Sequence, residues 1–206
     1  MGLENIIHNL DDAHISEVMR VEAEAWPEEL RASEEKFRSR LKIFPEGFFG
    51  IYVGSVLAGT LTSMRTNKQP TEDLKWAEVT GDGYIKNHEP NGRWLYVASL
   101  GISGRHAGQG LGKQLLAGGA FRLAKTSGCA GVFLQARPCD YDKYCKTNGE
   151  LPIERYLKLR KADGSHIDKE LRFYERAGFE IVKPVENGEE DKASRNYTVT
   201  MQYLVK

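Results

Sequence analysis

Residues 108–113 read Gly108-Gln109-Gly110-Leu111-Gly112-Lys113. The apolar run from Trp94 to Ile102 before them is typical of a buried strand, and the segment from Leu111 to about Ala124 has the spacing of an amphipathic helix. A glycine-rich turn between a strand and a helix lets backbone N–H groups converge on an anion at the helix N-terminus. The sequence therefore predicts a site for a phosphate-bearing ligand.

The composition restricts the class of protein. The 206 residues carry 29 basic and 29 acidic side chains, so the zero net charge gives no reason to expect a nucleic acid or a membrane as partner. The N-terminal sequence lacks a secretory signal, and no linker-like stretch divides the chain. The three cysteines, Cys129, Cys139 and Cys145, lack zinc spacing. We therefore expect a single cytoplasmic domain over residues 1–206, with no metal site.

Helix and strand patterns interleave along the chain. Helices are expected after Asp11 and Asp12, from Ser33, and from Asp168 to Ala177. Strands are expected at Leu3–His8, Phe48–Val53, Val56–Met64, Gly131–Ala136, Phe179–Lys183 and Tyr197–Tyr203. In the last strand Tyr197, Val199, Met201 and Tyr203 alternate with the polar Thr198, Thr200 and Gln202. Hairpins at both ends predict an α/β fold whose central mixed β-sheet is flanked by helices.

Two long segments carry no clear pattern. Residues 65–93 are expected to form a loop with one short strand near Trp76 to Val79. Residues 138–166 are expected to be irregular apart from a short helix that opens at Pro152. Loops of this length in a compact domain are often functional.

Two common phosphate-binding templates fail on the glycine stretch. A Walker A loop would need a glycine where Ala107 stands and a hydroxyl residue where Gln114 stands. A dinucleotide fingerprint would need a third glycine at Lys113 or at Leu115, depending on the register. The ligand is therefore expected to be neither a nucleoside triphosphate nor a dinucleotide.

The glycine stretch fits the pyrophosphate loop of the GNAT acetyltransferases, and the chain resembles this family over nearly its whole length. The family pattern, Gln/Arg-x-x-Gly-x-Gly/Ala, can be placed on residues 105–110 or on residues 107–112. The spacing to Leu115 and Leu116 favours the second register, in which Ala107 replaces the usual Gln or Arg. A second match is Leu171–Phe179, which resembles the late helix-to-strand signature of the family.

The resemblance has two branches, and both stay open. Residues 25–29, 33–44 and 45–49 resemble the substrate-side helices of arylalkylamine-type acetyltransferases. Residues 87–92 look similar to a loop of that branch and of GNAT modules joined to carbon–nitrogen hydrolases, and residues 137–144 resemble the second group more.

The resemblance implies the GNAT fold and acetyl-CoA (coenzyme A) as the acyl donor. Backbone amides of the loop are expected to bind the pyrophosphate, with Arg105 or Lys113 as the nearby charge, and the amides of Leu100 and Ile102 to bind the pantetheine arm and polarise the thioester carbonyl. The residues implied at the coenzyme are Leu100, Gly101, Ile102, Arg105, Ala107, Gly108, Gln109, Gly110, Leu111, Gly112, Lys113 and Tyr174.

Catalytic roles follow from the same resemblance. Tyr174 is expected near the coenzyme sulfur, where its phenol protonates the departing thiolate; its alternative role is that of a core aromatic. The central strand carries Tyr96 and Ala98 where arylalkylamine enzymes place histidines, so the base is sought elsewhere. Glu78 is the first candidate and His88 the second; the alternatives are a solvated carboxylate and a residue that holds a turn. The acceptor site is expected to involve Tyr96, Arg137, Tyr141 and Tyr144.

The sequence thus predicts acetyl transfer from acetyl-CoA to a primary amine by direct attack in a ternary complex. A small-molecule amine is favoured because the segments 65–93 and 138–166 are long enough to close over a compact acceptor. The rival from another class is a non-catalytic acyl-CoA-binding module, and a third alternative is transfer to a hydroxyl. The resemblance also allows a homodimer.

Overall fold

The computed structural model describes residues 5–206, and the start of the expected strand Leu3–His8 lies outside this range. The chain divides into two compact units. The first unit comprises the chain up to Asn67, Val79–Val132 and Leu204–Lys206, and the second comprises Lys68–Glu78 and Phe133–Tyr203. Each unit is described by itself.

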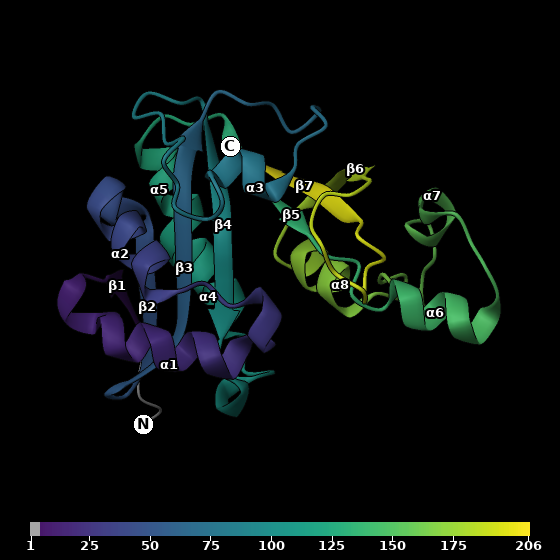
Figure 1. Ribbon diagram of the computed structural model, residues 1–206, viewed down its shortest axis with the longest axis horizontal. Helices are drawn as coiled ribbons and strands as arrows, with labels where there is room; N and C mark the ends of the chain where they lie inside the picture. The colour runs from purple at the N-terminus through teal and green to yellow at the C-terminus, as the bar shows by residue number, and fades with distance from the viewer. Residues whose placement is uncertain (1–4) are drawn as a thin grey trace. The chain divides into compact units, whose positions relative to one another are not determined.

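The first unit is built on an antiparallel sheet (Figure 1). Its strands are β1 (Ile6–Asn9), β2 (Phe48–Val53), β3 (Val56–Thr66) and β4 (Trp94–Ile102), in that order. The expected hairpin is confirmed: Val53 pairs with Val56, and Gly54 has a φ of +61° in the two-residue turn between them. The pairing of β3 with β4 shifts register between Thr62 and Ser63 of β3.

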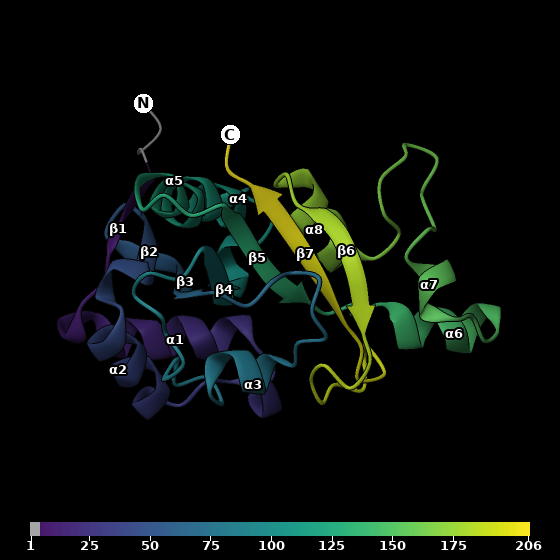
Figure 2. The same cartoon turned by 90° about the horizontal axis from the view of Figure 1, so that it is seen from above.

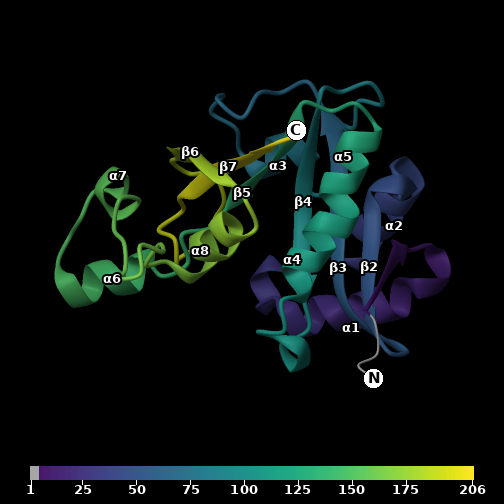
Figure 3. The ribbon, with the colours of Figure 1, turned by 180° about the vertical axis from the view of Figure 1, so that it is seen from behind.

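Helices cover both faces of this sheet. One face carries α1 (Ile15–Ala25) and α2 (Glu34–Ile43), and the other carries α4 (Leu111–Leu115), a π-helical segment (Leu116–Phe121) and α5 (Arg122–Thr126), as Figures 2 and 3 show. Short 3-10 turns lie at Asp12–His14, Glu28–Leu30, Pro45–Gly47 and Gly104–His106. The expected helix starts are confirmed, since Asp11 and Ser33 accept capping hydrogen bonds from Ala13 and Lys36.

Two glycines explain how the helical layer behind the sheet packs so closely. A Cβ on Gly118 would lie 2.8 Å from Ile7 Cδ1, and one on Gly119 would lie 3.0 Å from the Phe49 ring. Both glycines belong to the π-helical segment. The helix expected from Leu111 to about Ala124 therefore extends to Thr126, with a wider turn where it presses on the sheet.

The second unit combines strands with short helices. Its strands are β5 (Gly131–Ala136, from Phe133 on), β7 (Thr198–Leu204, up to Tyr203) and β6 (Glu180–Val185), and β6 pairs antiparallel with β7. The helix α8 (Lys169–Arg176) packs against β6 (Figure 2). Its expected ends are confirmed: the Asp168 side chain accepts hydrogen bonds from the amides of Glu170 and Leu171, and Gly178 has a φ of +100°. The remaining helices are α6 (Tyr141–Asn148) and α7 (Ile153–Tyr156), the latter opening after Pro152 as expected.

Two expectations about the fold are wrong. The strand near Trp76 is the short helix α3 (Trp76–Thr80), whose first amide donates to Gly188 O, so a tertiary contact outweighs the local β propensity. Residues 141–148 form α6, although no side-chain hydrogen bond caps it. In β7 the polar Thr198 and Thr200 are fully buried, as are Val199 and Met201, so both faces of that part of the strand are covered.

No helix between residues 5 and 206 combines the length and the apolar character that crossing a bilayer requires.

Candidate functional site

The glycine loop has an unusual backbone. Gly108 has a φ of +77° and Gly110 a φ of +75°, which is the left-handed region that glycine enters without strain. A Cβ at either position would meet nothing within 4 Å, so the loop faces open space. Gly112, by contrast, is buried in the first turn of α4. The left-handed pair bends the chain into a concave turn in front of the helix.

Backbone donors line this turn. Within residues 5–206, no group accepts a hydrogen bond from any amide between Gly108 and Lys113. The first amide after the loop, that of Gln114, donates to Gly110 O. Six consecutive N–H groups are therefore available where a helix begins. Such a row, together with the positive end of the helix dipole, favours a phosphate or pyrophosphate.

Two cations flank the loop. The Arg105 guanidinium is 78% exposed and lies 3.5 Å from Glu24 Oε1, whereas Lys113 is exposed and makes no ion pair within residues 5–206. The hydrogen bond from the Ser103 hydroxyl, followed by the charges of Arg105 and Arg20, lowers the pKa of Glu24. Glu24 is therefore anionic and holds Arg105 by an exposed, weak pair that an anionic ligand can displace.

The start of the loop is anchored to the sheet. Ser103 is fully buried, its amide donates to Ala58 O at 2.9 Å, and its hydroxyl donates to Glu24 Oε2. The exposed loop thus begins at an anchored residue, directly after β4.

The predicted pantetheine positions lie at the end of β4. Leu100, Gly101 and Ile102 pair with Leu61, Thr60 and Gly59 of β3. A Cβ on Gly101 would lie 3.1 Å from both Ala25 Cβ and Trp26 Nε1, so a larger residue would press on the end of α1. Tyr96, expected at the acceptor, is fully buried in the same strand.

Tyr174 lies on α8 in the second unit. Its ring packs edge-on against Phe173 and Phe179, with ring centroids 4.9 and 5.7 Å away. No group within residues 5–206 forms a hydrogen bond with its hydroxyl. Burial raises the pKa of Tyr174 above its ordinary value, and the nearby charge of Glu170 raises it further. The phenol is therefore protonated at neutral pH and has a proton to donate.

A buried carboxyl one helical turn before Tyr174 escaped the sequence analysis. Glu170 Oε1 accepts a hydrogen bond of 2.9 Å from the Arg137 amide, and Arg137 Nε lies 4.0 Å from Glu170 Oε2 and 3.7 Å from Asp191 Oδ2. Burial raises the pKa of Glu170 to about 7; Arg137 opposes the rise, whereas Asp168 and Glu189 add to it. The i, i+4 spacing from Tyr174 was the available signal.

The expected acceptor residues of the second unit take different roles. Tyr141 is buried, its hydroxyl donates to Leu151 O at 2.6 Å, and burial raises its pKa to about 12. Tyr144 is half-buried and lines a pocket. Arg137 is largely buried beside Glu170 and Asp191. Tyr141 therefore acts mainly in packing, whereas Tyr144 has an accessible face.

One group of possible metal ligands occurs in the described chain. The donor atoms of Cys139, Asp140 and Asp168 lie within 4.8 Å of one another. The Asp168 carboxylate, however, accepts hydrogen bonds from the Asp140 amide and the Tyr156 hydroxyl besides capping α8. The oxygens of Asp168 are therefore engaged in hydrogen bonds that hold the fold together.

The two candidate bases differ in their surroundings. His88 Nδ1 accepts a hydrogen bond of 3.1 Å from the Arg65 amide, and the ring stacks on Phe44 with centroids 4.3 Å apart. Burial and the charge of Arg65 lower the pKa of His88. Glu78 is exposed on α3, not on the strand from which a base was expected.

Comparison with known proteins adds a family match and close relatives. Residues 13–142 match the model described as the acetyltransferase (GNAT) family. The uncharacterized N-acetyltransferase YkwB of Bacillus subtilis (strain 168) is 30% identical over 202 residues, which cover 96% of this chain and 87% of that protein. The probable hydrolase YhcX of the same organism is 24% identical over 200 residues, and this chain spans 38% of its length.

A solved structure has the same fold. The GNAT-like decarboxylase GphF, in complex with isobutyryl-CoA, matches with a TM-score of 0.84 and 21% identity, over 98% of this chain and 100% of that one. The predicted α/β fold with a mixed sheet is confirmed. The family match includes the glycine loop and ends before Tyr174.

Proposed function

The chain belongs to the GNAT family of acetyltransferases and uses acetyl-CoA, and we propose that it transfers the acetyl group to a primary amine of a small molecule. The observation that carries this proposal is the row of six unengaged amides from Gly108 to Lys113 at the start of α4. Such a row suits the pyrophosphate of coenzyme A. When bound, acetyl-CoA supplies an acetyl group activated as a thioester.

The register of the pyrophosphate loop deepens the proposal. The backbone favours the register 105–110 over the register 107–112 that the helix spacing favoured, because Gly108 and Gly110 have left-handed φ and Gly112 does not. In this register Arg105 occupies the Gln/Arg position of the family pattern. We propose that Arg105 leaves Glu24 and contributes charge to the pyrophosphate, beside Lys113.

Tyr174 is the proposed proton donor to the thiolate. Its raised pKa keeps the phenol protonated, and its hydroxyl is not committed to another group of the described chain. Glu170 is a positioning residue in this scheme: as a carboxylate it raises the pKa of Tyr174, and with its own pKa near 7 it links that effect to pH.

Direct attack of the amine on the thioester is supported by the cysteines. Cys129 and Cys145 are buried, and burial raises the pKa of Cys129. Burial, with the charges of Glu170 and Asp168, raises the pKa of Cys139 far above its ordinary value. A thiol with a raised pKa is a poor nucleophile, so a covalent acyl-enzyme on Cys129 or Cys139 is disfavoured.

Glu78 is the proposed base. Its exposed carboxylate on α3 can receive the ammonium proton, whereas the only lone pair of neutral His88, on Nδ1, is taken by the Arg65 amide. We propose that His88 holds the turn before β4 instead. A cytoplasmic location, a homodimer, and the absence of nucleic-acid partners remain part of the proposal.

The test follows free thiol while the protein is incubated with acetyl-CoA and a panel of small primary amines. Thiol release that requires an amine and disappears in Glu78→Gln or Tyr174→Phe supports the proposal. Turnover with alcohols alone would replace the amine by a hydroxyl acceptor. Binding of acetyl-CoA with no turnover on any acceptor would contradict transfer and favour an acyl-CoA sensor. A parallel reaction with malonyl-CoA checks for the decarboxylation that GphF is named for.

A further inference from the structure

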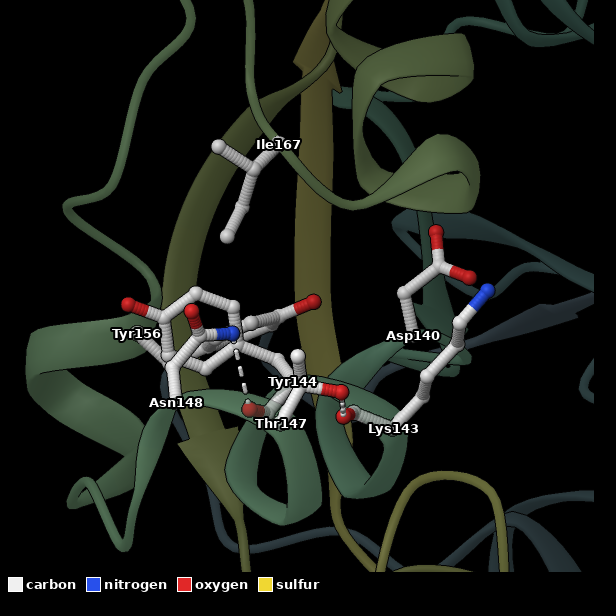
Figure 4. A pocket seen from close by; sticks show the side chains of 7 residues that line it. All are labelled: Asp140, Lys143, Tyr144, Thr147, Asn148, Tyr156 and Ile167. Atoms are coloured by element: carbon white, nitrogen blue, oxygen red, sulfur yellow. Dashed lines mark hydrogen bonds between the residues drawn. The ribbon is translucent and has the colours of Figure 1, made fainter.

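A pocket of about 320 Å³ opens in the second unit, within residues 140–167 (Figure 4). Its lining residues are Asp140, Lys143, Tyr144, Thr147, Asn148, Tyr156 and Ile167. All but Asp140 lie beyond residue 142, where the family match ends. Of the residues given a role in acetyl transfer, only Tyr144 is among them, so the pocket is a feature that the proposed reaction does not explain.

One side of the pocket carries two opposite charges. Figure 4 shows the Asp140 carboxylate and the Lys143 ammonium on the same side, away from the aromatic rings. Lys143 is exposed and forms no ion pair within residues 5–206. Asp140 Oδ2 accepts a hydrogen bond of 3.0 Å from the Lys169 amide, and Oδ1 lies 3.9 Å from Lys169 Nζ. Both charges retain capacity for a ligand.

The other side is apolar. The rings of Tyr144 and Tyr156 meet edge-on with centroids 5.4 Å apart, and Ile167 projects toward them (Figure 4). The Tyr156 hydroxyl is already committed to Asp168 Oδ2 at 3.0 Å, so this residue offers its ring rather than a polar group. This side suits a flat or branched apolar group.

The walls are fixed before any ligand arrives. Asp168 joins the two sides, because it accepts hydrogen bonds from the Tyr156 hydroxyl and from the Asp140 amide at 2.8 Å. Within α6, Asn148 Nδ2 donates to Tyr144 O at 3.0 Å and Thr147 Oγ1 donates to Lys143 O at 2.9 Å. Walls held in this way lower the entropy lost on binding.

We propose that this pocket binds a free α-amino acid with an apolar, preferably aromatic, side chain. The ammonium pairs with Asp140, the carboxylate with Lys143, and the side chain lies against Tyr144, Tyr156 and Ile167. The volume is at the lower end of ligand sites, which suits a molecule of this size. An ammonium held by a carboxylate stays protonated and is no nucleophile, so the site is one for binding and is separate from acetyl transfer.

The first experiment titrates L-phenylalanine into the full chain by calorimetry, without acetyl-CoA. The wild type is expected to bind with a Kd of about 1 mM or below. Lys143→Ala should weaken binding at least about 5-fold, because the ligand carboxylate loses its partner. The matched control is Lys146→Ala, on the same helix, whose ammonium pairs with Asp142 at 2.6 Å and does not line the pocket. Its affinity should be that of the wild type.

The second experiment changes the ligand. Phenethylamine lacks the carboxylate, 3-phenylpropionate lacks the ammonium and L-alanine lacks the ring, so each should bind at least about 5-fold more weakly than L-phenylalanine. Lys143→Ala should bind L-phenylalanine no more tightly than phenethylamine. It should still bind L-phenylalanine more tightly than 3-phenylpropionate. Circular dichroism of Lys143→Ala checks that the fold is retained.

Two results would overturn the proposal: no saturable binding of L-phenylalanine to the wild type up to about 10 mM, or equal affinities of wild type and folded Lys143→Ala. Because neither titration contains acetyl-CoA or an acceptor, these outcomes are independent of whether the acetyl transfer proposed above occurs.

Discussion

The glycine loop of the first unit and the surroundings of α8 in the second unit present opposite kinds of chemistry. The loop offers main-chain amides, exposed and shaped by two left-handed glycines, Gly108 and Gly110. Around α8 the chemistry belongs to side chains, Tyr174, Glu170 and Arg137, whose properties are set by burial. A main-chain site depends on local conformation, and a side-chain site depends on what packs around it.

This difference decides how each region responds to mutation. Substitution in the loop acts through backbone conformation, so a β-branched side chain at a left-handed glycine is harmful because it strains the backbone. Substitution near α8 acts through charge and proton affinity, so an isosteric change is enough to move the properties of the site. The following predictions separate these two responses.

The largest effect is expected from Tyr174→Phe. If the phenol donates the proton to the thiolate, kcat should fall about 100-fold with little change in KM for acetyl-CoA. Stability should hardly change, because the hydroxyl has no hydrogen-bond partner within residues 5–206. Tyr52→Phe, which removes a phenol hydroxyl 3.4 Å from Glu17, is the control. Steady-state kinetics in which both variants keep the wild-type kcat would refute the proton-donor role.

The next effect is expected from Gly108→Val. A β-branched side chain is strained at a φ of +77°, so the loop should change shape and the affinity for acetyl-CoA should fall about 30-fold. Gly128→Val is a matched control, since Gly128 has a φ of +67° and equally open surroundings outside the loop. Thermal unfolding should show similar destabilisation of the two variants, and calorimetry should show lost affinity in Gly108→Val alone. Equal affinities would contradict the assignment of the loop.

A smaller effect is expected from Glu170→Gln and depends on pH. The folded-state pKa of Glu170, about 7, exceeds that of an unfolded glutamate, so the folded protein binds more protons and its stability falls as pH rises between these values. The side-chain amide of the variant does not titrate, so this loss of stability with rising pH is absent from it. Between about pH 4 and pH 8, the unfolding free energy of the variant should therefore rise by about 2 kcal/mol relative to that of the wild type. This is less than the full pKa shift of Glu170 implies, because its side chain is 22% exposed and solvent screens the charge.

Denaturant titrations across that pH range provide the measurement. The exposed Glu180 supplies the control, since Glu180→Gln should follow the wild-type profile. A profile of Glu170→Gln parallel to that of the wild type would show that the carboxyl titrates normally.

The smallest effect is expected from His88→Ala. Loss of the acceptor for the Arg65 amide and of the stacking on Phe44 should cost about 1 kcal/mol of stability and leave kcat unchanged. His8→Ala, which removes an exposed ring stacked on Tyr52, is the control. A fall in kcat of more than about 10-fold in folded His88→Ala would make His88 the base after all.

Much of the fold followed from local signals. The hairpin at Gly54-Ser55, the strand Trp94–Ile102 and the caps at Asp11, Ser33 and Asp168 are confirmed because turn and cap residues act on neighbouring backbone groups. The segments around Trp76 and Tyr141 were misassigned, since their conformation depends on distant partners such as Gly188 O and Leu151 O.

The candidate site, like the fold, has one part that local sequence signals predicted and one part that they did not. A glycine pattern in front of a helix pointed to the loop, because glycine is the residue that enters left-handed backbone without strain. The local signal for Glu170, its i, i+4 spacing from Tyr174, did not reveal that the carboxyl is buried. Its raised pKa comes from burial beside Arg137, which lies 33 positions away in the chain.

The sequence by itself determined the family, the acyl donor and the loop at Gly108–Lys113, because these rest on short-range backbone rules and a contiguous motif. Only the tertiary structure decided that Tyr141 packs while Tyr144 lines a pocket, that the lone pair of His88 is occupied, and that Glu170 titrates near neutral pH. The reason is physical: a side chain's solvation and partners come from residues remote in the chain, and those are fixed when the chain folds.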